Sequence, residues 1–199
     1  MKSDTSGVEE SETRWPRDDD RLFVESTWAF DAHLVRDPAE RFYRMPMGYK
    51  RAGDLLIDQA ATNVVDRANV IYAALFCYRQ SIELFLKRLI AEFGNGRAYK
   101  KKHVHELNVL WDRFMDVVND RAIGDPNGLV AAQKLIAEMH MADEKSDGFR
   151  FPTDLGGAAF SFGDRGIDLP NLREVMQGLV NFFECTDLAW SHRDSATAE

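Results

Sequence analysis

The chain has 199 residues, of which 45% are hydrophobic and 29% charged, and its formal net charge is −8. This length and composition are typical of one globular domain that buries a core without disulfides or metal staples. The acidic balance excludes a protein that coats nucleic acid nonspecifically, because such coating requires a basic face.

The sequence also indicates where the chain resides. No apolar run reaches the length of a membrane span, and the N-terminal residues lack the apolar stretch of a secretory signal. Cys77 and Cys185 lie in apolar helical contexts, with no second Cys or spaced His nearby to complete a metal site. We interpret both as core residues in a reducing compartment. The expected location is the cytoplasm, without a membrane partner.

The N-terminal quarter of the chain lacks helical periodicity. Residues 1–20 are polar and acidic, which predicts a disordered tail. Residues 21–47 are irregular, aromatic and interrupted by two prolines. They are predicted to form a lead-in segment that packs across the domain, with 22–28 as a candidate short strand.

Helical spacing of apolar residues begins near Gly48 and predicts a bundle over residues 48–191. The first helix is expected over about 49–62, and residues 63–67 fit either a turn or a continuation. The second, about 68–93, is apolar on most of its surface, as in a helix at the centre of a bundle. Gly-Asn-Gly then ends it.

The remaining elements follow the same spacing, with one interruption. The third helix begins near His105, and the fourth spans about 126–141 with Asp125 as N-cap. Residues 142–169 break the pattern with paired glycines between aromatic stretches, which predicts a short β-hairpin. The last helix is expected to run to about Trp190, and residues 192–199 are predicted to be disordered. The fold class is therefore an all-α, up-and-down bundle of about five helices with an inserted hairpin.

The central helix carries a charged stripe, because Arg79, Glu83 and Lys87 follow one another at steps of four. One interpretation is a ladder of ion pairs on the surface. The other is a polar cleft inside the bundle, since unpaired buried charges would be very costly.

Two further segments are candidates for binding. Lys101 and Lys102 belong to a lysine run before His103 and His105, which fits a solvated loop or a phosphate site. The two histidines lack a third ligand, so no metal is expected. Arg150 lies between two aromatic residues, and we expect its stem to pack on rings and its head to pair with Glu83 or an aspartate.

These segments, taken in order, resemble the HEPN superfamily of helical bundles. The matching positions are Arg79, Glu83, Lys87, His105, Phe149, Arg150 and Pro152, and the likeness covers about residues 48–190. The resemblance implies a compact α-bundle that commonly forms a symmetric dimer. Many members are metal-independent ribonucleases of toxin–antitoxin, antiviral and RNA-processing systems, whereas others are inactive or bind nucleotides and RNA.

The sequence departs from the superfamily's nuclease signature. That signature is an Arg followed a few residues later by a His, usually at the start of the last helix. Here the last helix opens PNLREVMQG, with no His. The spacing recurs only between Arg97 and His103. We interpret this match as coincidental, because such matches arise by chance in a chain with 25 Lys and Arg residues.

The favoured hypothesis is a non-catalytic HEPN-like homodimer that binds RNA, a nucleotide or a protein partner encoded nearby. The binding cleft would contain Arg79, Glu83, Lys87, Lys101, Lys102 and Arg150. The alternative is a metal-independent endoribonuclease of a toxin–antitoxin or antiviral system. His103 or His105 would then take the 2′-hydroxyl proton, and Arg97, Arg79 or Arg150 would stabilise the scissile phosphate. No cofactor is expected.

Overall fold

The computed structural model describes residues 14–24, 32–96, 104–122, 124–154, 156–160 and 166–197. The chain divides into two units, 1–34 and 35–199. In the first unit, residues 14–24 contain no helix or strand, but they include a turn in which the Asp20 amide donates to the Arg17 carbonyl at 3.1 Å. The candidate strand therefore has no counterpart over 22–24, and the rest of it lies outside the described residues.

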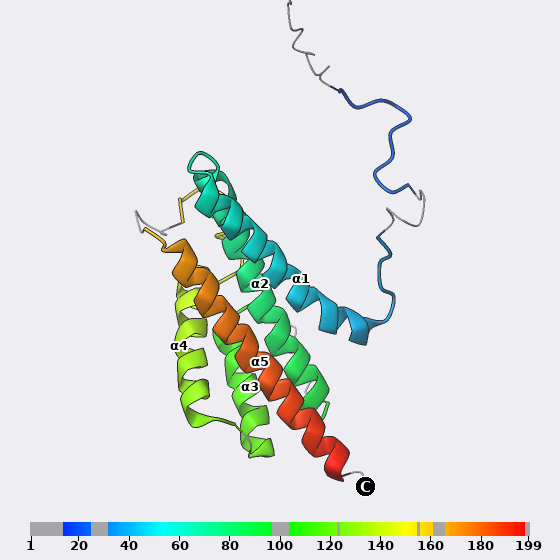
Figure 1. Cartoon of the computed structure of the whole chain (residues 1–199), viewed down its shortest axis with the longest axis vertical. Helices are drawn as coiled ribbons and strands as arrows, with labels where there is room; N and C mark the ends of the chain where they lie inside the picture. The colour runs from blue at the N-terminus through cyan, green and yellow to red at the C-terminus, as the bar shows by residue number, and fades with distance from the viewer. Residues whose placement is uncertain are drawn as a thin grey trace, which may run out of the picture. The chain divides into compact units, whose positions relative to one another are not determined.

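Five helices make up the described part of the second unit (Figure 1). They are α1 (Pro38–Thr62), α2 (Arg67–Phe93), α3 (Leu107–Arg121), α4 (Pro126–Ala142) and α5 (Leu169–Thr197). Each helix packs on the next from α1 to α5, and α5 also packs against α1 and α2. The all-α helical bundle is confirmed. None of the described helices combines the length and the apolar character needed to cross a membrane.

The core lies around α2, which buries residues on most of its faces, as its composition predicts. Aromatic rings join it to α5. Phe85 stacks on Phe183 with ring centroids 5.2 Å apart, and Phe93 meets Trp190 edge-on at the same separation. Such pairs stabilise a core beyond the area they bury. The position of α2 at the centre places its charged stripe inside the molecule.

The expected lead-in segment is wrong from Pro38 onward, because α1 begins there rather than near Tyr49. The Asp37 carboxylate caps this helix by accepting from the amides of Ala39 and Glu40 at 3.3 and 3.2 Å. Pro38 occupies the first turn, where the missing N–H costs nothing. Pro46 lies inside the helix, and its carbonyl accepts a bond from the Ser81 hydroxyl at 2.8 Å. The helix therefore continues through a proline at which the sequence pattern predicts a break, and Pro46 is buried there.

Two other boundaries differ from the expectations. The C-terminal residues 192–197 continue α5, where Asp194 accepts two bonds from Arg121 of α3 at 2.9 and 2.8 Å. In place of the hairpin, the described residues before α5 contain a single antiparallel bridge between Thr153 and Ala159. Paired glycines make a turn there, but no apolar face extends it into two strands.

The open question at residues 63–67 is resolved as a turn. The Asn63 side chain accepts from the amides of Val65 and Asp66 at 3.1 and 3.3 Å, which ends α1 and starts α2 at Arg67. An asparagine that bonds the backbone two residues ahead is a common turn former. The β-branched pair after it is exposed.

Candidate functional site

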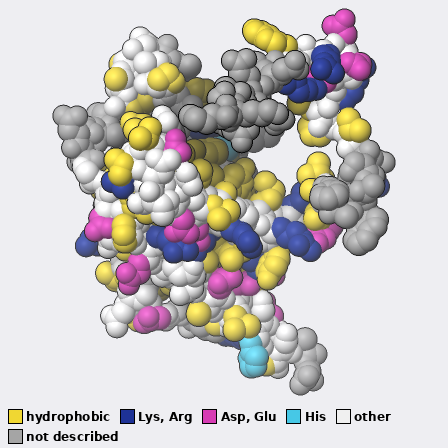
Figure 2. All heavy atoms as spheres, turned by 45° about the horizontal axis from the view of Figure 1, so that its top comes forward, with side chains coloured by type: hydrophobic (Ala, Val, Ile, Leu, Met, Phe, Trp, Pro, Cys, Tyr) yellow, Lys and Arg dark blue, Asp and Glu magenta, His cyan; other side chains and the backbone are white. Residues whose placement is uncertain are grey.

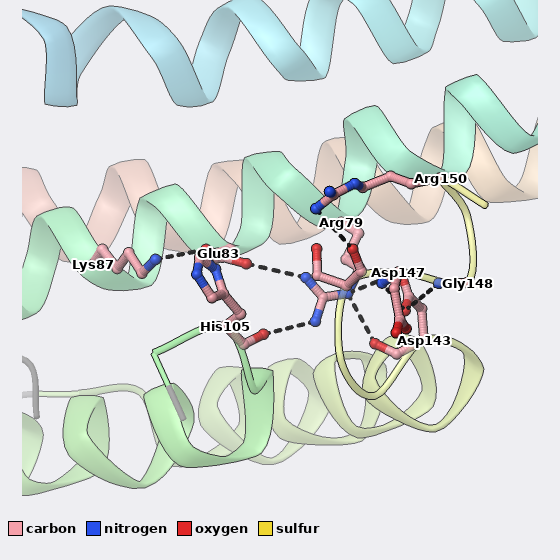
Figure 3. A network of polar contacts seen from close by, with 9 residues as sticks. Arg79, Glu83, Lys87, His105, Asp143, Asp147, Gly148 and Arg150 are labelled. Carbon is pink, nitrogen blue, oxygen red and sulfur yellow. Dashed lines mark hydrogen bonds and ion pairs between the residues drawn. The ribbon is translucent and has the colours of Figure 1, made fainter. Parts of the chain in front are cut away.

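Polar side chains gather where α2 meets the start of α3 and the loop after α4 (Figure 3). Arg79, Glu83 and Lys87 come from one face of α2, as their spacing predicts. His105 lies just before α3, and Asp143 ends α4. The bundle thus brings together residues that are far apart in the sequence.

Arg79 is the centre of this network, and its side chain is 0% exposed. Its Nε donates to the Asp143 carbonyl at 2.9 Å and its Nη1 to Glu83 Oε2 at 3.1 Å. Its Nη2 donates to the His105 carbonyl at 2.7 Å. A buried guanidinium without partners would be very costly, and here each nitrogen has one. Arg79 therefore joins α2 to the beginning of α3 and to the end of α4.

Asp143 organises the loop that follows α4. Its Oδ1 accepts from the amides of Asp147 and Gly148, both at 3.0 Å. Its Oδ2 lies 3.4 Å from Arg79 Nε, so the loop and the central helix share this buried carboxylate. The loop also holds Ser146 at φ +65°, a left-handed conformation that is uncommon for a residue other than glycine. We call Arg79, Glu83, Asp143 and the His105 carbonyl the Arg79 clasp.

Glu83 connects the clasp to the surface. Its side chain is 1% exposed, and its Oε1 accepts from Lys87 Nζ at 2.6 Å and lies 2.9 Å from His105 Nδ1. The His105 side chain is 62% exposed. A carboxylate only accepts hydrogen bonds, so this contact assigns a proton to Nδ1. In the neutral imidazole the lone pair then lies on Nε2, which Glu83 leaves uncovered.

The structure brings four of the predicted site residues together: Arg79, Glu83, Lys87 and His105. Neither interpretation of the stripe describes it fully, since Arg79 and Glu83 lie in the interior and pair there. The expected pairing of Arg150 with Glu83 or an aspartate is not found within the described residues. Among the described residues, the exposed Arg150 donates instead to the Ser146 carbonyl at 3.2 Å and lies 5.0 Å from the centre of the Phe151 ring.

The other predicted site residues, Arg97, Lys101, Lys102 and His103, lie outside the described residues. Sequence reasoning gave no role to Asp143, which the clasp requires. A signal for it exists, because an aspartate that ends a helix and precedes Asp147-Gly148 fits a side chain that bonds the following backbone amides.

A second polar cluster joins α1, α2 and α5, and the sequence pattern did not predict it. The Tyr78 hydroxyl donates to Asp54 Oδ1 at 2.9 Å, and Lys50 Nζ bonds Asp54 Oδ2 at 2.7 Å. Burial raises the pKa of Tyr78, and the hydrogen bond to Asp54 raises it further. A surface pocket of about 530 Å³ lies beside this cluster. Its lining is Lys50, Asp54, Ile57, Asp58, Ala61, Pro170, Arg173, Glu174 and Gln177.

That pocket carries charges of both signs, and they compensate one another. Arg173 lies 3.5 Å from Asp58 and 3.9 Å from Asp54, and Lys50 also donates to Gln177. Such a lining favours no one class of ligand. Across the described residues, no three His, Cys, Asp or Glu side chains converge closely enough to hold a metal ion.

The chain matches no known family model, and no curated protein or solved structure is significantly similar to it. Function must therefore be inferred from the chemistry of the residues themselves. The site between α2, α3 and the loop after α4 offers the clearest arrangement, because a buried acid there positions an exposed histidine.

Proposed function

We propose that this chain is a HEPN-like helical protein that binds a phosphate group of RNA or of a nucleotide at the exposed edge of the Arg79 clasp. The observation that carries the proposal is the 2.9 Å contact between buried Glu83 and His105, whose side chain is 62% exposed. Because Glu83 already holds the imidazole in one orientation, a ligand that binds there orders the side chain at a lower cost in entropy than at a freely rotating surface histidine. His105 is the anchor of the proposed site.

Arg150 supplies the second contact. It belongs to the loop that Asp143 holds against α2, and one of its nitrogens bonds the Ser146 carbonyl. A guanidinium has five N–H donors, so most remain for a ligand. Planar donors of this kind suit phosphate oxygens better than an ammonium does.

The sequence carries a run of positive charge shortly before His105. Lys100, Lys101 and Lys102 come within five residues of His105 in a chain whose net charge is −8. A concentrated positive run supports local binding of phosphate rather than general coating of nucleic acid. These lysines are therefore assigned to the same ligand.

Binding is favoured over catalysis because Arg79 is committed elsewhere. All three of its nitrogens bond protein acceptors in the interior, so it does not reach a scissile phosphate. The described groups that remain accessible suit recognition of an anion. The proposed protein is a binding module, and its expected homodimer is a separate part of the proposal.

The test is binding of a fluorescent single-stranded RNA, and separately of ADP, in chelator at low salt. Wild type is expected to bind, and log K for the RNA should fall against log salt by about 0.7 for each phosphate contact. His105→Ala or Arg150→Ala should each weaken binding and reduce the magnitude of this slope by about 0.7. His192→Ala, an exposed histidine on α5, is the matched control. If wild type binds neither probe, or if both variants bind as wild type does, the proposal fails.

The dimer has its own measurement. Sedimentation equilibrium at tens of micromolar, a rough range for weak interfaces, should give twice the monomer mass. A monomer at that concentration would remove the dimer and leave the phosphate site standing, since all its described residues come from one chain.

A metal-independent endoribonuclease is the second candidate, and the orientation of His105 favours it. Glu83 holds Nδ1, so Nε2 has the lone pair that a general base needs for a 2′-hydroxyl. Incubation of wild type with mixed RNA in chelator should then give cleavage that His105→Ala abolishes and His192→Ala preserves. Absence of cleavage at high protein concentration would rule against the ribonuclease and leave the binding module as the remaining proposal.

A further inference from the structure

The outer face of α1 has an unusual composition. Between residues 41 and 55 it exposes eight residues, and none of them is acidic. They are Arg41, Tyr43, Arg44, Met45, Met47, Gly48, Arg51 and Leu55. The whole chain carries 33 acidic residues, and the nearest ones on the surface of α1, Glu40 and Asp58, lie beyond the two ends of this stretch. Figure 2 shows basic, acidic and hydrophobic side chains interspersed on the face that it presents.

The arginines of this face keep donors available. Arg44 pairs with Glu40 at 2.6 Å, but both side chains are exposed, and such pairs are weak. Arg41 uses its Nε for the Val35 carbonyl. Arg51 has no ion pair among the described residues. Two arginines of this face, Arg41 and Arg51, therefore have no acidic partner among the described residues.

Gly48 lies on the same face, at helical steps from Arg44 and Arg51. A glycine inside a helix is destabilising relative to alanine. A Cβ added at Gly48 would meet nothing within 4 Å, so packing within the fold does not require glycine at this position. The consequence is a flat position at which the backbone of another molecule can approach α1 closely.

From these observations we infer that α1 docks an acidic, apolar-containing polypeptide of a different protein. Arg, Tyr and Met are the residues enriched at protein interfaces, where Asp, Glu and Lys are depleted. Arginines between the apolar side chains select carboxylates, and the apolar groups supply burial. The face runs over 15 residues, from Arg41 to Leu55, or about 21 Å along the helix axis, which matches a helix of roughly four turns.

Other occupants fit less well. A second copy related by a two-fold axis would bring a second set of arginines to this face, with Glu40, already paired with Arg44, as the nearest carboxylate. Single-stranded RNA needs open aromatic platforms, but Tyr43 has the Arg88 guanidinium over its ring at 4.9 Å. An anionic bilayer would be repelled by the net charge of −8, and the arginines here interrupt the apolar stripe that insertion requires.

The experiment uses the full chain and a labelled synthetic helical peptide with a Glu face and a Leu/Phe face. The matched peptide has Lys in place of Glu. The acidic peptide is expected to bind, and the basic one is not. Arg44→Gln with Arg51→Gln should weaken binding about tenfold or more. Gly48→Trp should abolish it, whereas Gly48→Ala should bind nearly as wild type does.

Circular dichroism and thermal unfolding establish that each variant is folded. Because the inference goes beyond the phosphate site, Arg44→Gln and Arg51→Gln should leave RNA binding at His105 unchanged. Equal binding of both peptides, binding that survives Gly48→Trp, or no binding of the acidic peptide would overturn the inference. So would tighter binding of single-stranded RNA or of phosphatidylglycerol vesicles to the same arginines.

Discussion

Arg79 donates a 2.7 Å hydrogen bond to the main-chain carbonyl of His105, so the guanidinium fixes the backbone of the residue that the neighbouring Glu83 orients. Backbone and side chain of His105 are thus held by two residues one helical turn apart. The exposed imidazole depends on a buried ion pair for its position.

Replacement of Arg79 by Ala should cost roughly 3–5 kcal/mol of folding free energy, because Glu83 and Asp143 would keep buried charges without their partner. Urea unfolding followed by circular dichroism measures the loss. Arg51→Ala, an exposed arginine on α1, is the control and should change stability by about 0.5 kcal/mol or less. An Arg79→Ala variant as stable as this control would show that the Arg79 clasp does not contribute to the free energy of unfolding.

Glu83→Gln keeps the shape of the side chain but removes the charge that faces Arg79 and Lys87. Stability should fall by roughly 1–3 kcal/mol, since both cations lose a charged partner in the interior. Histidine NMR provides a second readout, because the tautomer at His105 should no longer be fixed. His105 spectra identical to those of wild type would show that Glu83 does not determine the tautomer of the histidine.

Two glycines of α1 give opposite predictions for the same substitution. A Cβ at Gly53 would lie 2.5 Å from Tyr78 Cε1, so Gly53→Ala should destabilise by roughly 1–3 kcal/mol. A Cβ at Gly48 meets nothing, so Gly48→Ala should be neutral or stabilising by up to about 1 kcal/mol. Thermal unfolding of the two variants compares them directly. Equal melting temperatures would contradict the tight packing of α1 on Tyr78.

Alkaline pH should weaken the fold through Tyr78. Burial and Asp54 raise the pKa of its hydroxyl above the ordinary value of 10.0. The unfolded chain therefore loses this proton first as pH rises. The contribution of Tyr78 to stability is full below about pH 10 and declines above it, by at most about 1.4 kcal/mol per pH unit.

The matched variant for this prediction is Tyr78→Phe. It should be less stable than wild type at neutral pH by about 1 kcal/mol, because the bond to Asp54 is lost. Its stability should also fall less steeply above pH 10. Parallel curves for the two proteins between pH 9 and 11 would exclude Tyr78 as the source of the alkaline loss.

The sequence predicts well what periodicity controls. The apolar surface of α2 and the N-cap at Asp125 follow from local spacing, and the structure confirms both. It predicts poorly where tertiary contacts override a local rule. The sequence pattern predicts a break at Pro46, but Pro46 lies buried inside α1, and its carbonyl accepts a bond from Ser81 of α2.

The candidate site shows the same difference between what local spacing predicts and what tertiary contacts determine. Steps of four on one helix indicated that Arg79, Glu83 and Lys87 would lie together. The acceptors that satisfy Arg79 are main-chain carbonyls of residues 105 and 143, and no side-chain pattern encodes a carbonyl that only the folded bundle brings near. The acceptor of Arg150 is likewise a main-chain carbonyl, that of Ser146, whereas Glu83 pairs with Arg79.

The amides of Asp147 and Gly148 donate to a carboxylate that is itself held by the central helix. Separating the loop from the bundle would also leave Arg79 buried without its partner Asp143. We therefore expect opening of the loop to be coupled to the unfolding of α2. Those two amides should therefore exchange with deuterium about as slowly as the core of α2, although the loop lies between two helices and contains no regular structure. A segment without regular structure is thus expected to unfold together with the central helix, as part of one cooperative unit.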